Sequence, residues 1–140
     1  MNVLIDTNIA LDILLKREPY FKNAARISIL SEKGYIRCYI SASAVTDIYY
    51  IVKKELKNKD VVIDLLKKLL KTINIAAVTE TAIYEALDLG WNDFEDSVQY
   101  VSGQKIRADF IITRNPKDFT ESLIKVRTPD EFVNQIARKK

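Results

Sequence analysis

The segment NVLIDTN (residues 2–8) decides how this chain begins to fold. Its uncharged start, NVLI, is typical of a short buried strand, and the polar residues that follow are types that commonly begin helices. We therefore expect Thr7 or Asn8 to cap a helix that runs to about Arg17. The first charged residue of the chain, Asp6, then lies at the carboxyl end of the predicted strand.

Outward from this segment, short apolar stretches alternate with longer stretches of helical periodicity. Further strands are predicted at residues 36–40, 73–78, 109–113 and 124–127. A helix is predicted at 20–33, and Gly34 lies where the end of a helix favours a left-handed residue. A second helix is predicted after a cap at Ser41 or Ser43, and others at 60–72, 79–89, 93–106 and 116–122, and from Pro129. This alternation is typical of the α/β class, in which a parallel β-sheet is sandwiched by α-helices. We expect a single domain over residues 1–140, with functional residues beyond the carboxyl ends of the strands.

The composition excludes several catalytic chemistries. The chain has 140 residues, with no His, one Cys and three scattered Gly. Without His there is no Ser-His or Cys-His nucleophile and no imidazole metal ligand, and a single Cys excludes a CxxC zinc site. Isolated glycines do not form a phosphate-binding GxGxxG loop. Any catalysis must therefore use carboxylates, hydroxyls, amides, Lys or Arg.

Charge and hydropathy indicate a soluble protein. The net charge of +3 permits a nucleic-acid partner without implying one. No uncharged apolar run approaches the roughly 20 residues of a membrane span, and the amino terminus lacks the basic segment of a signal peptide. A single Cys fits a reducing compartment. We therefore expect a cytoplasmic location and no membrane contact.

Four aspartates lie at positions that a role as exposed surface charges does not explain. Asp6 follows a buried strand, and Asp47 is the only charged residue in the segment 38–52. Asp93 and Asp96 open a later helix, in a stretch with six acids and no Lys or Arg. An acid at the edge of an apolar helix face, as expected for Asp47, must be paired, protonated or bound to a cation.

Each of these aspartates also has a structural interpretation. Asp6, Asp93 and Asp96 could offset helix dipoles, a contribution of about 0.3–1 kcal/mol each. Asp47 could pair with a Lys or Arg from elsewhere in the chain. Glu95 falls on a different face of its predicted helix and is expected in solvent.

If the four aspartates converge, their repulsion requires a neutralising cation. Two carboxylates about 4 Å apart repel by about 4 kcal/mol at an effective dielectric of about 20. Oxygen ligands without His or Cys favour a hard cation, Mg²⁺ or Mn²⁺, over Zn²⁺. Such an ion neutralises a phosphoryl oxygen and lowers the pKa of water, so metal-assisted hydrolysis of a phosphodiester is the natural reaction.

The sequence resembles the PIN-domain ribonucleases, which include the toxins of bacterial and archaeal toxin–antitoxin pairs. The resemblance covers essentially the whole chain. It rests on four blocks in this order: VLIDTN (3–8), SASAVTDIYY (41–50), DFED (93–96) and IITRNPKDF (111–119). It implies a PIN-like fold, a parallel sheet between helices, with an acid cluster that binds Mg²⁺ or Mn²⁺.

By position, the resemblance assigns the metal-site acids. Asp6 matches the first acid and Asp96 the third, with Asp93 as an alternative or a supplement. Asp47 stands where the family often has Glu. These four residues are the predicted metal ligands and catalytic residues.

The segment after the last buried strand departs from the family pattern. Asn115 stands where another acid is common, and Asp118 could replace that acid only if the turn brings it round. Thr113 and Asn8 are expected to orient water or the ligand carboxylates.

The resemblance implies an endoribonuclease that hydrolyses single-stranded or structured RNA, as the toxin of a toxin–antitoxin pair with an antitoxin protein as partner. Arg114 and Lys117 are expected near the rim of the site, where they would steer the RNA backbone unless they belong to a solvated loop. The apolar stripe of residues 60–72 is expected in the core, with room for a homodimer contact.

Other functions remain open at this point. Asn115 and the short Asp47 side chain motivate a catalytically weak or inactive PIN-like module that binds RNA or a protein partner. A phosphatase with an Asp6 nucleophile would want a second Asp where Asn8 stands. A receiver-like phosphoacceptor would also use an acid at a strand end, but no paired-acid block precedes that strand in this sequence.

Overall fold

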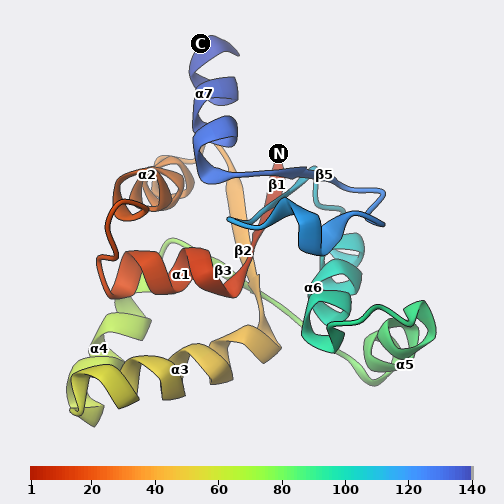
Figure 1. Ribbon diagram of the computed structural model, residues 1–140. Helices are drawn as coiled ribbons and strands as arrows, with labels where there is room; N and C mark the ends of the chain where they lie inside the picture. Colours follow the sequence, from red (N-terminus) through yellow and green to blue (C-terminus); the bar gives the residue numbers. More distant parts are fainter. Residues whose placement is uncertain (140) are drawn as a thin grey trace.

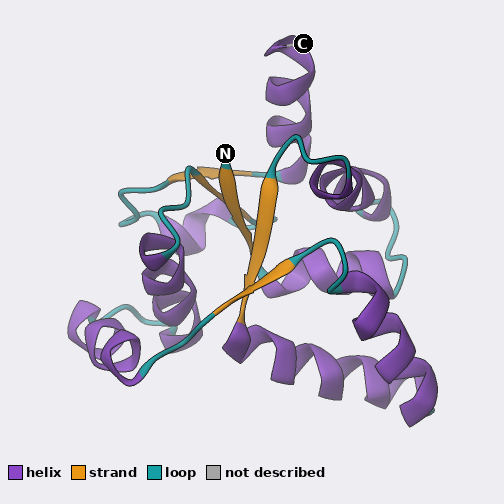
Figure 2. Cartoon of the chain, turned by 180° about the vertical axis from the view of Figure 1, so that it is seen from behind, coloured by secondary structure: helices purple, strands orange, loops and turns teal. Residues whose placement is uncertain are grey.

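A five-stranded parallel sheet forms the centre of the chain, with helices on both faces (Figures 1 and 2). The structure is a computed structural model, and it describes residues 1–139. The strands are β1 (Asn2–Ile5), β2 (Arg37–Ser41), β3 (Asn74–Ala76), β4 (Phe110–Ile112) and β5 (Lys125–Arg127), in the spatial order β3-β2-β1-β4-β5. The helices are α1 (Thr7–Leu14), α2 (Phe21–Glu32), α3 (Ala42–Leu56), α4 (Lys59–Leu69), α5 (Glu80–Leu89), α6 (Phe94–Lys105), the 3₁₀ helix η1 (Pro116–Phe119) and α7 (Pro129–Lys139). The predicted α/β class, a parallel sheet sandwiched by helices, is confirmed.

The first strand lies in the middle of the sheet. In register, Val3 pairs with Cys38 of β2, and Leu4 pairs with Ile111 of β4. Val3 and Leu4 point to opposite faces, as the two-residue period of a strand requires, and both are fully buried. A strand covered on both faces reads as a continuous apolar run, which explains why the segment 2–5 carries no charge.

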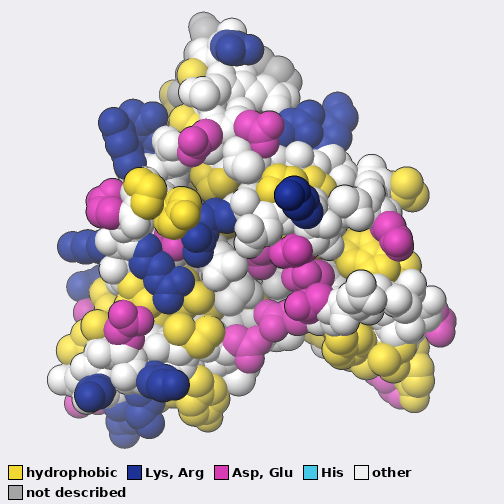
Figure 3. All heavy atoms as spheres, in the orientation of Figure 1, with side chains coloured by type: hydrophobic (Ala, Val, Ile, Leu, Met, Phe, Trp, Pro, Cys, Tyr) yellow, Lys and Arg dark blue, Asp and Glu magenta, His cyan; other side chains and the backbone are white. Residues whose placement is uncertain are grey.

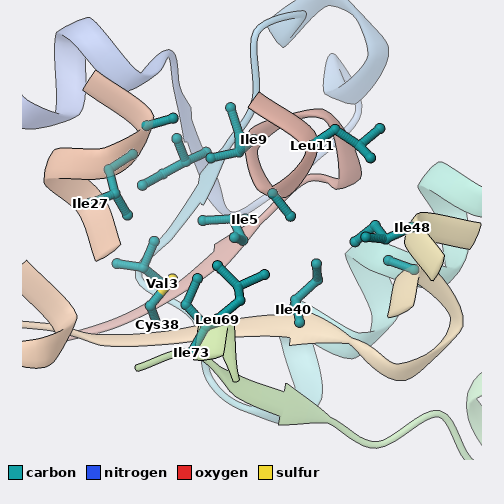
Figure 4. Close-up of a cluster of buried hydrophobic side chains, with 14 of the residues drawn as sticks. Val3, Ile5, Ile9, Leu11, Ile27, Cys38, Ile40, Ile48, Leu69 and Ile73 are labelled. Atoms are coloured by element: carbon teal, nitrogen blue, oxygen red, sulfur yellow. The ribbon is translucent and has the colours of Figure 1, made fainter. Parts of the chain in front are cut away.

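Two layers of helices cover the sheet unequally. On the face of Val3, residues of α1, α2, α3, α4 and α7 form the larger core, part of which appears in Figure 4. On the face of Leu4, α6 and η1 contribute Tyr100 and Phe119 to a smaller core. The helix α5 packs on α6 through Ala82 and Ala86. The carboxyl ends of the strands therefore lie between the helices α1, α3 and α4 and the α5–α6 pair (Figure 1).

Some predicted boundaries were wrong. The helix α1 ends at Leu14, not near Arg17, and Lys16 adopts a left-handed conformation with φ of 51°. Its cap is Asp6 and not Thr7 or Asn8, because Asp6 keeps extended dihedrals while its carboxylate accepts a hydrogen bond from the Thr7 N–H.

The predicted helix 60–72 is also shorter in the structure. The helix α4 ends at Leu69, and its outer apolar residue Val61 is 43% exposed. Most of the predicted stripe is core, as expected, and the homodimer contact stays a prediction. Among the described residues, no helix combines the length and apolarity needed to cross a membrane.

Candidate functional site

An acidic cleft opens where the chain leaves the carboxyl ends of β1 and β4. It has a volume of about 510 Å³ and is walled by the starts of α1 and α6, the outer face of α3, and η1. Its described lining includes six carboxylates and no Lys or Arg; the acids are Asp6, Asp47, Asp93, Glu95, Asp96 and Asp118. In Figure 3 the acids form a continuous band across the middle of this face. The structure therefore brings together all four aspartates that the sequence singled out.

Asp6 is the most buried acid of the cleft, with only 6% of its surface exposed. One carboxylate oxygen accepts the Thr7 N–H at 2.7 Å, and the other accepts the Thr113 hydroxyl at 2.8 Å. The Asp6 N–H donates to the Ile112 carbonyl at 2.9 Å, which ties the start of α1 to β4. These bonds hold the carboxylate in one orientation while leaving lone pairs for a ligand.

The start of α6 supplies three further acids. Asp93 caps the helix, because its carboxylate accepts the Asp96 N–H at 3.1 Å. The pKa of Asp96 is raised to about 7, first by partial burial and then by the negative charges of Asp93, Asp6, Asp118 and Glu95, in that order. Asp96 therefore carries a proton for a large part of the time at neutral pH. An acid at the start of a helix offsets the helix dipole, and the start of α6 also borders the cleft. Asp93 and Asp96 can therefore stabilise the helix and line the cleft at the same time.

The prediction that Glu95 lies in solvent was wrong. Its carboxylate lines the cleft and accepts a hydrogen bond from the Thr7 hydroxyl at 3.2 Å. Burial raises the pKa of Glu95, and so does its contact with the carboxyl of Asp47. The helix α6 begins at Phe94 with Asp93 as cap, which turns Glu95 toward α1.

The burial argument for Asp47 was also wrong. This residue lies on the exposed side of α3, so its carboxylate does not pay the desolvation cost expected from the sequence. What places it in the site is its contact with Glu95 from the facing helix α6.

A hydrogen-bonded chain behind the acids was missed from the sequence. Gln99 is buried, lines the cleft, and donates from Nε2 to the Thr7 hydroxyl oxygen at 3.3 Å. That hydroxyl in turn donates to Glu95. The Oε1 atom of Gln99 has no hydrogen-bond partner among the described residues. The spacing of Glu95 and Gln99, four residues apart on one helix, was the signal that could have revealed this pair.

The remaining predicted residues divide into two groups. Asn8 and Asp118 line the cleft, and Thr113 supports Asp6. The turn at η1 therefore does bring Asp118 round to Asp96. Asn115 is exposed and does not line the cleft; its N–H donates to the Thr113 hydroxyl oxygen at 3.1 Å.

Arg114 and Lys117 do not line the cleft either. Lys117 is exposed, whereas the guanidinium of Arg114 turns inward, with Nε 3.0 Å from Oδ2 of Asp12, and stacks 4.1 Å from the Tyr20 ring centre. Asp12 is fully buried, and it went unnoticed in the sequence because it resembles any polar residue on an amphipathic helix. The contact is a charge pair without hydrogen-bond alignment. RNA binding by Arg114 and Lys117 stays a prediction.

The donor chemistry of the cleft fits a hard divalent cation. Six carboxylates without a lining Lys or Arg leave an excess of negative charge, which adds to burial in raising the pKa of Asp96. The unpaired Oε1 of Gln99 could accept a hydrogen bond from water of a hydrated ion. In residues 1–139, however, no three His, Cys, Asp or Glu side chains are already close enough together to hold an ion. Mg²⁺ would therefore need side-chain rotation or retained water, which it commonly keeps.

Comparison with known families identifies a sequence match over most of the chain. The sequence model described as the PIN domain matches residues 2–117. A comparison with curated proteins found no match.

Solved structures share the fold at low sequence identity. The chain is similar to a protein of a toxin–antitoxin complex from Klebsiella pneumoniae, with a TM-score of 0.68 and 23% identity over 91% of this chain and 97% of that one. It is similar to a chain of the VapBC2 complex of Rickettsia felis, solved with a promoter DNA fragment, with a TM-score of 0.70 and 17% identity over 91% and 98% of the two chains. For the Sarcin-Ricin loop cleaving toxin VapC20 of Mycobacterium tuberculosis, the TM-score is 0.69 at 11% identity, over 89% and 98%. At these identities, the similarity shows a common fold.

Proposed function

The chain belongs to the PIN-domain family, and on that premise we propose that it is an endoribonuclease that hydrolyses phosphodiester bonds of RNA with Mg²⁺ or Mn²⁺. The observation that carries the proposal is the convergence of six carboxylates from four separate segments on one cleft without a lining Lys or Arg. Such a cluster is costly to assemble, since neighbouring negative charges add to burial in raising the pKa of Asp96 and of Glu95. A purely structural role would not require it.

The residues that would hold the ion are Asp6, Asp47 and Asp96, with Asp93 in support. When bound, a hard divalent cation supplies charge neutralisation for the phosphodiester and lowers the pKa of the attacking water. The chain itself orients the ligands: the Thr113 hydroxyl and the Thr7 N–H fix the Asp6 carboxylate. Hydrolysis in line at phosphorus would leave a 5′-phosphate and a 3′-hydroxyl.

Proton binding at Asp96 has a consequence for this reaction. A carboxyl with a pKa of about 7 is a weak ligand until it loses its proton. Cation binding and protonation therefore compete at Asp96, and we expect the apparent affinity for the ion to rise between about pH 6 and 8.

A direct test compares the wild type with two isosteric variants. Asp6→Asn removes the most buried acid of the cleft, and Asp88→Asn removes an exposed acid of α5 outside it. Each protein is incubated with end-labelled single-stranded RNA in Mg²⁺, in Mn²⁺ and in EDTA. Cleavage by the wild type and Asp88→Asn, lost in Asp6→Asn and in EDTA, supports the proposal; equal cleavage by all three in EDTA contradicts it.

The biological role proposed is that of the toxin in a toxin–antitoxin pair, acting in the cytoplasm with an antitoxin protein as partner. Fold relatives described as members of toxin–antitoxin complexes support this proposal. Expression of the wild type should stop growth, whereas Asp6→Asn should not. A small reading frame next to the gene, whose product co-purifies with the chain and restores growth, would identify the antitoxin.

The second candidate is a PIN-like module without catalysis. It is favoured by the exposed Asn115, which lies outside the cleft, and by the absence of a ready-made three-ligand cluster in the described chain. Metal titration separates the two functions. An inactive module should show no rise of melting temperature in millimolar Mn²⁺, whereas an ion-binding site should show a measurable one.

A further inference from the structure

The outer face of α3 carries an ordered series of side chains that leads away from the acidic cleft. Asp47, Tyr50 and Lys54 are spaced at i, i+3 and i+7, so they lie along one line of the helix surface. The first two line the cleft, and Lys54 is exposed beyond it. The face therefore passes from acid to aromatic ring to cation within two turns.

The ring of Tyr50 is both exposed and oriented. It is 64% exposed although it borders the cleft. The neighbouring Tyr49 contacts it edge to face, with ring centres 5.2 Å apart and an interplanar angle of 86°. An edge-to-face neighbour restricts the ring while leaving its face available for stacking.

The end of α3 is strongly basic. Residues 53–59 contain four lysines and one acid, Glu55. All four lysines are exposed, and none forms an ion pair with a residue that the structure describes. Figure 3 shows Lys and Arg side chains gathered over the α3–α4 side of the face, apart from the acidic band.

The cleft cannot by itself attract a polyanion, because its described lining carries six acids and no Lys or Arg. Affinity for a nucleic acid must therefore come from outside the cleft. Aromatic rings that stack on bases and lysines that contact phosphates are the usual elements of single-strand binding. Along α3 the acid Asp47 is followed by the ring of Tyr50 and then by Lys54. A single RNA strand presents a phosphate, a base and the next phosphate in the same order.

We infer that a surface formed by Tyr50 and Lys54 of α3, together with Lys57 at the C-cap of the helix, binds single-stranded RNA. An unpaired base stacks on Tyr50 next to the scissile phosphodiester, and the two lysines hold the adjoining phosphates. The inference rests on the proposed function, and it assigns the residues outside the acids of the cleft that hold the RNA next to the scissile bond. A base within a duplex keeps its faces stacked on its neighbours and cannot lie on the ring. Because every base has a π-face, the contact selects unpaired RNA and not a particular base.

The experiment measures binding apart from cleavage. Fluorescence anisotropy of a short labelled single-stranded RNA is recorded with the full chain in EDTA. Tyr50→Ala should weaken binding by about 5- to 150-fold, and Tyr50→Trp should retain it. The matched control is Tyr84→Ala, because Tyr84 on α5 is equally exposed at 62% but lies outside the cleft.

Two further measurements test the base and the phosphates separately. An RNA with abasic positions should bind the wild type more weakly, and Tyr50→Ala should not distinguish it from intact RNA. The double variant Lys54→Ala, Lys57→Ala should lower the slope of log K against log salt by about 0.7 for each lost phosphate contact. Lys22→Ala, an exposed lysine of α2, should leave that slope unchanged.

The outcomes separate this inference from the proposed function. Binding that depends on Tyr50 without any cleavage in Mg²⁺ or Mn²⁺ supports the α3 face and contradicts the nuclease. Cleavage with equal RNA affinity in Tyr50→Ala and the wild type overturns the inference and leaves the nuclease intact. A Tyr50→Ala variant that keeps its RNA affinity but loses a dimer, seen by light scattering, also overturns it, because the face is then an interface between copies.

Discussion

Replacing Arg114 by Ala should destabilise the fold far more than its position in a surface loop suggests. The Nε atom of Arg114 lies 3.0 Å from Oδ2 of Asp12, whose side chain is fully buried. Neither carboxylate oxygen of Asp12 accepts a hydrogen bond from a described residue, so the guanidinium is its main compensation. Burial already raises the pKa of Asp12, while Arg114 and then Arg17 lower it.

The expected loss of folding stability in Arg114→Ala follows from the distance between the two charges. At 3.0 Å the attraction is about 5–6 kcal/mol for an effective dielectric of about 20. Removing one partner of a buried pair costs about 3–5 kcal/mol, because the other charge is left without compensation. With an unfolding entropy of about 2.1 cal/mol/K for each of the 140 residues, this loss corresponds to a fall of about 10–17 °C in melting temperature.

Thermal unfolding followed by circular dichroism tests this expectation. Lys117→Ala is the control, since Lys117 is an exposed cation of the same segment. The double variant Asp12→Leu, Arg114→Met should recover most of the loss, because it leaves no buried charge. The deficit of Arg114→Ala should shrink as the pH falls from 8 to 4, since a protonated Asp12 needs no partner.

Two results would refute the reasoning. If Arg114→Ala lost no more stability than Lys117→Ala, the ion pair would not compensate Asp12. If the deficit were the same at pH 4 and pH 8, charge would not be its cause.

Three other perturbations have defined outcomes. The pKa of Asp96 is raised from its ordinary value of 3.8 to about 7 in the folded chain, so its contribution to stability is present below about pH 4 and lost as the pH rises through 7. Asp96→Asn should therefore melt higher than the wild type at pH 8 and at the same temperature at pH 4, and equal melting at both would contradict this. Thr113→Val should lower the free energy of unfolding in urea by about 1–3 kcal/mol, because it removes a hydrogen bond to the buried Asp6 carboxylate. A loss below about 0.5 kcal/mol, the spread of neutral surface substitutions, would show that this bond is not needed for stability. Addition of Mn²⁺ at about 100 times its Kd should stabilise the wild type by about 2.7 kcal/mol in calorimetry and should leave Asp6→Asn unchanged. An equal gain in both proteins would show that the ion binds elsewhere.

Much of the fold could be predicted because its signals are local. The apolar run at 2–5 and the alternation at 36–40 marked the strands, and the positions of Ser41 and Gly34 marked helix ends. Ser41 does cap α3, with its hydroxyl oxygen accepting the Ala44 N–H, and Gly34 does adopt a left-handed φ of 81° after α2. Each of these features depends on neighbours within a few residues, which a sequence displays directly.

The candidate site was predicted in part, for the same reason. Asp6 and Asp96 were recognisable because a charge directly after a buried strand, or in a stretch without cations, is visible in the chain itself. Glu95 was misplaced because its partners are distant in the chain: the Thr7 hydroxyl of α1 donates to it, and Asp47 of α3 contacts it.

Asp12 and Arg114 show what sequence could not supply. They lie 102 positions apart, and nothing near either residue indicates that one is buried and the other turns inward to meet it. The sequence alone determined the order of strands and helices, the oxygen donors of an acid cluster in a chain without His, and the end of the sheet where acids gather. Only the tertiary structure decided which acids share a cleft, which of them has a pKa near 7, and which arginine compensates a buried charge. The reason is that burial and Coulomb interactions depend on distances across the fold and not on separation along the chain.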